Sequence, residues 1–288
     1  MDKKIIINAD DFGLSYGVSD GILKAHQEGI VTSTSLMTNQ IDSVRALIEG
    51  LKYPNLGIGV HLVITKGSPI SNQNDVCSLV DSTGEFYNQN ELYKRRGKIE
   101  INEIYIEYCN QIERFFRISG RLPNHLNTHH FIGNIYPPFF KILLKVAEKY
   151  NLPIRFPKFE ERLFDINELT YLLGGIPVEK LRKYQEENYN LLKNSKVIYP
   201  DNFIPGFFGI NKITKENLLS ILDSSDQLTE IMVHPGFIDK YLTKISTYTD
   251  ERKKELNVLI SREIKEYVKS NRVNLINQEF LIHNSIQI

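Results

Sequence analysis

Ile5-Ile6-Ile7-Asn8-Ala9-Asp10-Asp11-Phe12-Gly13 opens the chain with an apolar run that ends in two adjacent carboxylates. Such a run is typical of a strand buried on both faces, as in parallel sheets covered by helices. Two negative charges at the end of a buried strand raise each other's pKa unless a positive charge lies nearby. A divalent metal would supply that charge, with one Asp as ligand and the other free as a base.

Short apolar runs alternate with amphipathic helical patterns along the rest of the chain. We expect strands at 4–9, 32–37, 56–63, 123–128, 152–156, 230–233 and 273–276. We expect helices at 17–29, 43–53, 99–118, 137–150, 214–222 and 250–270. This alternation predicts an α/β fold, a distorted (β/α) barrel of parallel strands with outer helices. Because no long linker interrupts it, we expect a single domain over 1–288, with excursions at about 66–98 and 159–200.

The composition excludes several classes of partner. The 288 residues carry 35 basic and 35 acidic side chains, so nothing favours nucleic acid or an anionic membrane surface. No apolar stretch is long enough to span a membrane. The two cysteines, Cys77 and Cys109, form no Cys-x-x-Cys motif, which fits a reducing compartment. We therefore expect a cytoplasmic protein.

Histidines follow two further apolar runs of the predicted sheet. His61 ends Gly57-Ile58-Gly59-Val60-His61, and His125, His129 and His130 lie in one short segment after residue 123. A lone histidine in an apolar strand is more often a hydrogen-bonded core residue, but these lie at successive strand ends. One histidine of the cluster could complete an Asp/His/His site, and the others could orient ligands or pack. Such a ligand set leaves positions open for water and substrate.

Two more polar residues lie at predicted strand ends. His234 precedes Pro235-Gly236, which forces a turn, so its ring could serve as a general acid near a leaving nitrogen. Arg155 could hold a carboxylate through two hydrogen bonds, and Asp10 is the natural partner. Since active sites of such barrels form at the carboxyl ends of the strands, these residues predict a metal-dependent hydrolase.

The chain resembles the YdjC-like carbohydrate deacetylases. The resemblance runs from residue 5 to about 280 and rests on Asn8-Ala9-Asp10-Asp11-Phe12-Gly13, Gly59-Val60-His61, His125-Leu126-x-x-His129-His130 and Val233-His234-Pro235-Gly236. It implies removal of N-acetyl groups from amino-sugar oligosaccharides, often phosphorylated, by a protein that is frequently a homodimer.

The resemblance also implies roles for individual residues. Asp11, His61 and His129 match the metal ligands, and the ion would be Mg²⁺ or Zn²⁺. Asp10 matches the general base and His234 the general acid, while Arg155 matches an arginine that orients the base. We further expect a substrate-binding set around them: His125, His130, Asn127 and Phe12.

One segment departs from the family pattern His-Leu-Asp-Ser-His-x-His-x-His. Asn127 stands at the position of the Asp, and Phe131 and Gly133 stand at the positions of the last two histidines. Two other functions stay open, and these changes support only the second of them. One is a metal phosphoesterase on the same barrel rim, and the other is a sugar-binding protein without catalytic activity.

Overall fold

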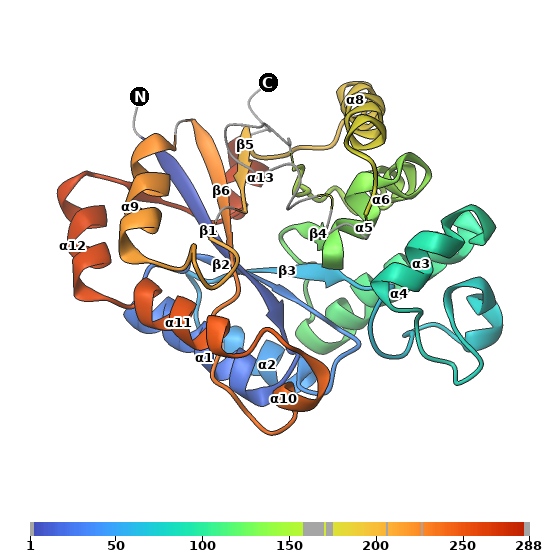
Figure 1. Ribbon diagram of the computed structural model, residues 1–288, viewed down its shortest axis with the longest axis horizontal. Coiled ribbons are helices and arrows are strands. Elements are labelled where there is room, and N and C mark those ends of the chain that lie inside the picture. Colours follow the sequence, from blue (N-terminus) through green and yellow to red (C-terminus); the bar gives the residue numbers. More distant parts are fainter. Residues whose placement is uncertain (1–2, 158–169, 171–174, 206, 226, 285–288) are drawn as a thin grey trace.

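The computed structural model describes residues 3–157, 170, 175–205, 207–225 and 227–284. The part of the chain so described forms a seven-stranded sheet in the order β4-β3-β2-β1-β6-β5, with β7 paired to β1 (Figure 1). Every pairing between these strands is parallel. The strands are β1 (Lys4–Phe12), β2 (Ser33–Leu36), β3 (Gly57–Leu62), β4 (Leu126–Thr128), β5 (Asn202–Ile204), β6 (Leu228–Val233) and β7 (Asn274–Leu275).

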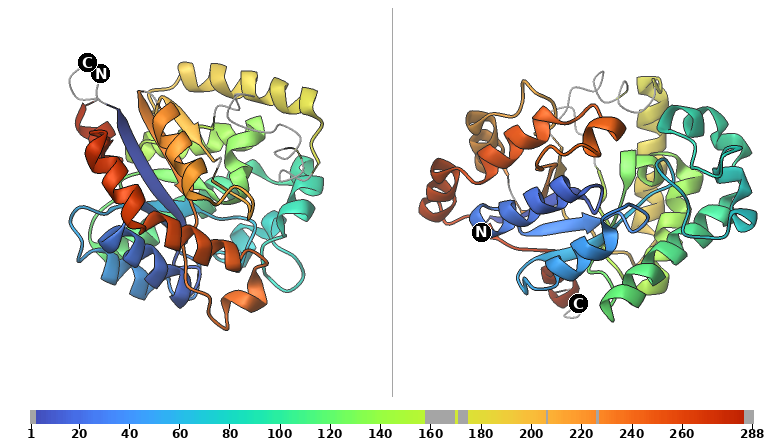
Figure 2. Two further views of the ribbon diagram at one scale, coloured as in Figure 1. Left: turned by 60° about the vertical axis from the view of Figure 1, so that its left-hand side comes forward. Right: turned by 90° about the horizontal axis from the view of Figure 1, so that it is seen from below.

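Helices surround the curled sheet on its outer side, which confirms the predicted α/β barrel-like fold (Figures 1 and 2). Neighbouring helices pack along the outside in the order α8-α6-α4-α2-α1-α11. The helices are α1 (Tyr16–Glu28), α2 (Ser43–Gly50), α3 (Gln89–Arg95), α4 (Ile101–Ser119), α5 (Ile132–Ile135), α6 (Pro137–Tyr150), α8 (Val178–Lys193), α9 (Lys215–Ser224), α10 (Leu242–Ile245), α11 (Asp250–Leu259), α12 (Arg262–Ser270) and α13 (Glu279–Asn284).

The central strand β1 separates the apolar core from a polar barrel interior. Ile5, Ile7 and Ala9 belong to the hydrophobic core. Successive side chains of a strand point to opposite faces, so Asn8 and Asp10 share the other face. Both are fully buried there. The alternation of β1 therefore places polar groups inside the barrel and below its rim.

Most of the expected elements are present, and three expectations need correction. The helix expected at 250–270 is two helices, because Ser261 between them has an extended backbone. The strand expected at 152–156 is reduced to one bridge between Ile154 and Leu126. Strand β5 at 202–204 was not expected, since three residues give too short a pattern to recognise. Most of the predicted excursion at 159–200 before α8 lies outside the described residues.

The excursion at 66–98 contains α3 and three short 3-10 turns, and it lies beside α4 at one end of the molecule (Figures 1 and 2). Glu107 of α4 anchors it, because its buried carboxylate accepts hydrogen bonds from the backbone of Ile70 and Ser71 and from the Ser71 hydroxyl. The excursion is thus attached to the barrel through a buried polar contact as well as apolar side chains.

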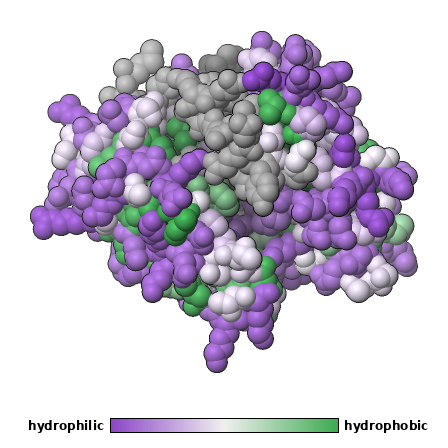
Figure 3. All heavy atoms as spheres, viewed as in Figure 1, coloured by the Kyte–Doolittle hydropathy of each residue, from purple (hydrophilic) through white to green (hydrophobic). Residues whose placement is uncertain are grey.

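The surface is mostly hydrophilic on the face seen in Figure 3, where apolar residues form small scattered patches. No helix in the described ranges combines the length and apolar character that crossing a membrane requires.

Candidate functional site

A β-bulge at the end of β1 brings both carboxylates to the site. The pairing with β2 advances from Ala9 to Phe12 on one strand but only from Thr34 to Leu36 on the other, so β1 holds one extra residue. Asp11 takes a left-handed backbone with φ of 68°. Adjacent strand residues normally face opposite ways, and the bulge lets Asp11 join Asp10 on the interior side. Such strain costs about 1–3 kcal/mol and is typical of functional sites.

Asp10 is held by a dense set of donors. Arg155 donates from Nη1 to Oδ2 at 2.6 Å and from Nη2 to Oδ1 at 2.7 Å. Oδ1 also accepts from Asn8, Ser35 and Asn127, at 2.8 to 3.1 Å. Burial opposes the charge of Asp10, but the Arg155 guanidinium outweighs it and holds the pKa well below its usual range. Asp10 is therefore ionised and fixed in one orientation.

Arg155 is itself fixed by a second carboxylate. Its Nε donates to Glu230 of β6 at 2.8 Å, and the side chain is 1% exposed. Its guanidinium also lies over the ring of Phe203 in β5, at 4.9 Å from the centroid. Burial raises the pKa of Glu230, although Arg155 lowers it. The pair explains how a buried arginine is tolerated beneath the site.

Asp11, His61 and His129 present three ligand atoms to one point. Oδ1 of Asp11 lies 3.4 Å from Nε2 of His61 and 3.3 Å from Nδ1 of His129. The two imidazole nitrogens are 3.1 Å apart. In the described part of the chain this is the one group of three or more His, Cys, Asp or Glu residues that could hold a metal ion. Oδ1 of Asp11 is buried and lacks a hydrogen-bond partner.

Asn127 determines which nitrogen of His61 faces this point. Its Nδ2 donates to Asp10 and to Ser35, so its Oδ1 must be the atom that accepts from Nδ1 of His61, at 2.6 Å. The proton of the neutral ring is therefore on Nδ1, and Nε2 carries a lone pair. Burial lowers the pKa of His61, which keeps that lone pair free. The lone pair of His61, the free Oδ1 of Asp11 and the ring nitrogen of His129 beside them form a donor set suited to a cation.

Arg252 of α11 forms an ion pair with the other oxygen of Asp11, Oδ2. Its Nη2 donates to Oδ2 at 2.5 Å, and both side chains are 4% exposed. Burial opposes the charge of Asp11, but Arg252 and then His129 hold its pKa well below the usual range. Each of the two adjacent carboxylates thus has its own arginine.

His234 lies in an aromatic enclosure after β6. The rings of Phe208 and Tyr248 are stacked at 4.6 Å, and both meet the His234 ring edge-on. Glu255 of α11 accepts from the backbone N–H of His234 at 2.5 Å and from the Tyr248 hydroxyl at 2.6 Å. Burial lowers the pKa of His234 to about 4, although Asp11 and Asp10 raise it. The ring is therefore neutral at pH 7 and positioned mainly by packing.

Comparisons with known proteins identify the family of this chain. A family model described as YdjC-like protein matches residues 4–270. The chain belongs to the YdjC-like family.

Two curated YdjC-like relatives are named carbohydrate deacetylases. The protein of Geobacillus stearothermophilus is 35% identical over 280 residues, 96% of this chain and 97% of its own length. That of Clostridium beijerinckii is 32% identical over 277 residues, 95% and 98% of the two chains. A crystal structure from Enterococcus faecalis, described as a candidate cellobiose-phosphate cleavage protein, covers 98% of this chain and 99% of its own. It has a TM-score of 0.83 at 32% identity.

Four further residues were expected to meet substrate in this YdjC-like protein. Phe12 is fully buried and its ring lies against α2 near Gly50. Asn127 and His125 are also buried, and burial lowers the pKa of His125 to about 3. His130 stacks on His129 with ring centroids 3.7 Å apart, and its Nδ1 lies 3.0 Å from the Thr65 hydroxyl. Of these four, only His130 is partly exposed.

The two histidine positions that differ from the family pattern have structural partners. Phe131 has a left-handed backbone and meets Phe203 edge-on. A Cβ on Gly133 would lie 2.7 Å from Thr128 and 2.9 Å from the hydroxyl of Tyr108. The space of a larger side chain at residue 133 is thus already filled by these two neighbours.

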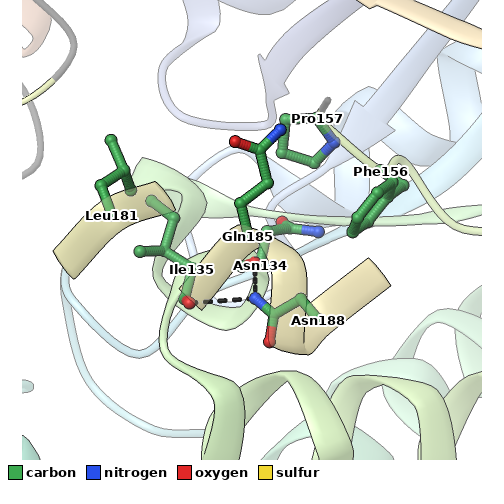
Figure 4. Close-up of a pocket in the computed structure, with 7 residues that line it drawn as sticks. All are labelled: Asn134, Ile135, Phe156, Pro157, Leu181, Gln185 and Asn188. Carbon is green, nitrogen blue, oxygen red and sulfur yellow. Dashed lines mark hydrogen bonds between the residues drawn. The ribbon is translucent and has the colours of Figure 1, made fainter. Parts of the chain in front are cut away.

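A small crevice lies on the far side of this segment (Figure 4). It has an empty volume of about 190 Å³ and lies between α5, α8 and the residues that follow Arg155. Asn188 donates to the backbone oxygens of Asn134 and Ile135 across it. The crevice encloses no space large enough for a bound molecule, so we assign it no ligand.

Sequence reasoning missed several residues that support the site. Arg252 and Glu255 lie on α11 among other charged residues, and Tyr248 lies in the loop before that helix. Glu230 and Ser35 lie inside predicted strands. A charged residue in the apolar run Leu228–Val233 was the one available signal, because buried charges require partners.

Proposed function

We propose that this protein is a metal-dependent deacetylase that removes the acetyl group from an acetylated amino sugar. The observation that carries the proposal is the convergence of Oδ1 of Asp11, Nε2 of His61 and Nδ1 of His129 beside an ionised Asp10. Membership of the YdjC-like family and the carbohydrate deacetylases among its relatives support the substrate class.

The donor set fits a small divalent cation. Three ligands placed tetrahedrally at about 2.0–2.1 Å from an ion would lie about 3.3 Å apart, close to the three separations found here. The charges are compatible with a cation. Burial raises the pKa of Glu255 to about 8, so this group is mostly neutral at pH 7, and three other buried carboxyls lie beside two buried guanidiniums. These groups are Asp10, Asp11, Glu230, Arg155 and Arg252. When bound, such an ion would polarise the amide carbonyl and acidify the attacking water.

Asp10 is our candidate for the general base. It is ionised, buried and oriented by Arg155, so it is placed to accept a proton from the attacking water. His234 is our candidate for the acid that protonates the departing amine. Because His234 is neutral in the free protein, it must first take up a proton from solvent before it can protonate the amine. Negative charge that develops on the substrate would raise the pKa of His234, as the charges of Asp11 and Asp10 already do.

We also propose which metal ion binds and which kind of sugar is the substrate. Two imidazoles and one carboxylate favour Zn²⁺ over Mg²⁺ by ligand preference. We include a phosphorylated disaccharide among the proposed substrates, because one relative is described as a candidate cellobiose-phosphate cleavage protein. We also propose that the protein is a homodimer and that it works in a reducing, cytoplasmic compartment. Cys77, which is exposed, and Cys109, which is buried, are free cysteines. This supports the reducing compartment but not the homodimer.

Metal analysis combined with acetate release tests the proposal directly. The protein would be freed of metal, reloaded with Zn²⁺ or Mg²⁺ and incubated with N-acetylated mono- and oligosaccharides, with and without a phosphate group. We expect acetate release that requires metal. Release of phosphate instead would favour a phosphoesterase, and sugar binding without either product would favour a non-catalytic protein. In the described residues the absence of a second ligand group argues against a two-metal phosphoesterase.

A further inference from the structure

Arg252 leaves Asp11 only one oxygen for a ligand. Its Nη2 donates to Oδ2 at 2.5 Å, whereas Oδ1 has no hydrogen-bond partner and faces His61 and His129. A carboxylate that could offer two oxygens is thereby limited to one.

The position of Arg252 is fixed by three further contacts. Its Nε donates to the backbone oxygen of Tyr248 at 3.2 Å, and its own carbonyl accepts from the backbone of Gly236 at 3.1 Å. Its Cβ also packs against Gly236. Arg252 is 4% exposed, and turning its guanidinium away from Oδ2 would break the Nε bond to Tyr248 and the contact with the Tyr248 ring, which lies 5.6 Å from the guanidinium carbon. Bringing both oxygens of Asp11 to one ion would therefore require the Arg252 side chain to give up these contacts.

We propose that Arg252 is a positioning residue that keeps Oδ2 of Asp11 occupied and thereby restricts the site to cations satisfied by one carboxylate oxygen beside two imidazoles. This rests on the metal site proposed above and adds a reason for its selectivity. Imidazole-rich sets suit Zn²⁺, whereas Mn²⁺, Mg²⁺ and Ca²⁺ prefer carboxylate, carbonyl and water oxygens. Ca²⁺ in particular binds at 2.3–2.6 Å, often to both oxygens of a carboxylate. Its ligands would lie farther apart than 3.1–3.4 Å.

The test compares two metals rather than one. Metal-free wild type and Arg252→Met would each be titrated with Zn²⁺ and with Mn²⁺, without substrate. Removing a positive charge changes the affinity for both divalent ions in the same direction, so the ratio Kd(Mn²⁺)/Kd(Zn²⁺) isolates the effect of the freed oxygen. We expect the ratio to fall by at least about 10-fold, the lower end of the effect of residues that orient metal ligands. An unchanged ratio would overturn the proposal.

Arg262→Met is the matched control, because it makes the same chemical change at an exposed arginine that pairs with Glu266 on α12. Its ratio should equal that of wild type. If Arg252→Met does not fold, Arg252→Lys and a crystal structure of the Zn²⁺-loaded wild type serve instead. Zn²⁺ bound to Oδ1 alone, with Oδ2 still on Arg252, supports the proposal, and Zn²⁺ on both oxygens overturns it.

The outcomes separate this inference from the proposed function. A wild type that binds neither metal would overturn the metal site and this inference together. A wild type that binds Zn²⁺, with an unchanged ratio in Arg252→Met, would overturn the role of Arg252 alone.

Discussion

Arg155 donates to both oxygens of Asp10, at 2.6 and 2.7 Å, so the proposed base is oriented by a fork that a lysine could not reproduce. We expect Arg155→Lys to lower kcat by roughly 10²-fold or more, because the base loses its orientation. The acid limb of the pH–rate profile should move to higher pH, since burial then raises the pKa of Asp10 against a weaker opposing charge. Arg45→Lys is the control, as Arg45 makes a similar two-point contact with Asp42 at the surface. Equal losses in both variants would contradict the role.

Replacing Asp10 by its amide and replacing Asp11 by its amide should have different effects on metal binding and turnover. Asp10→Asn is expected to retain metal and lose at least about 100-fold in turnover, the usual scale for removing a general base. Asp11→Asn should lose metal affinity as well, because Oδ1 of Asp11 is one of the three converging atoms. Calorimetric metal titration and acetate release on both variants check this. Wild-type turnover in Asp10→Asn would mean that another group accepts the proton.

Asn127→Asp should have two opposing effects. A carboxylate would accept more strongly from Nδ1 of His61 and raise the basicity of that ligand, which tightens metal binding by about 10-fold or more. The same carboxylate would replace a donor that lies 3.1 Å from Oδ1 of Asp10, and this like-charge contact should raise the pKa of Asp10. We expect a lower metal Kd together with an acid limb at higher pH. Identical dissociation constants in wild type and variant would defeat the first expectation.

Glu255 should make the stability of the metal-free protein depend on pH. Burial raises its pKa to about 8, so the folded state binds a proton more tightly than the unfolded state. The contribution is complete below the unfolded pKa of about 4.3 and is lost as pH rises toward 8. Glu255→Gln should remove this slope, which is at most about 1.4 kcal/mol per pH unit. Urea unfolding of both proteins at pH 5, 6.5 and 8 tests it, and parallel curves would count against the assignment.

Gly133→Ala should destabilise the protein although alanine normally favours helices. The added Cβ would meet Thr128 at 2.7 Å and Tyr108 at 2.9 Å, and overpacking of this kind costs about 1–3 kcal/mol. Gly97→Ala is the control, because no atom lies within 4 Å of a Cβ built there. A thermal shift of similar size in both variants would show that the neighbours of Gly133 move aside easily.

The architecture could be predicted from the sequence because β1 and the strands after it have strong apolar patterns. An apolar run buried on both faces followed by a helical stripe repeats along the chain, and polar residues at strand ends must share one rim. That rule placed these polar residues at one rim and made Asp10 the natural partner of Arg155. It left open which Asp and which clustered histidine would converge with His61, and only the family resemblance singled out Asp11 and His129.

The support residues could not be predicted, because they depend on contacts between distant segments. Arg252 reaches Asp11 across 241 positions of sequence, and on α11 it resembles the exposed charges around it. The sequence also does not predict the left-handed backbone of Asp11, which brings both carboxylates inward. No feature of Asn-Ala-Asp-Asp-Phe-Gly indicates a β-bulge.

The central place of β1 has a consequence for how the chain is made. β2 and β3 follow β1 closely and can pair in sequence, but β6, its neighbour on the other side, begins only at Leu228. During synthesis on the ribosome the apolar edge Ile5–Ile7 must therefore remain unpaired until most of the chain has emerged. Unpaired apolar edges promote aggregation of folding intermediates. We expect nascent chains that end before residue 228 to be bound by chaperones, whereas chains that extend past β7 fold and are released.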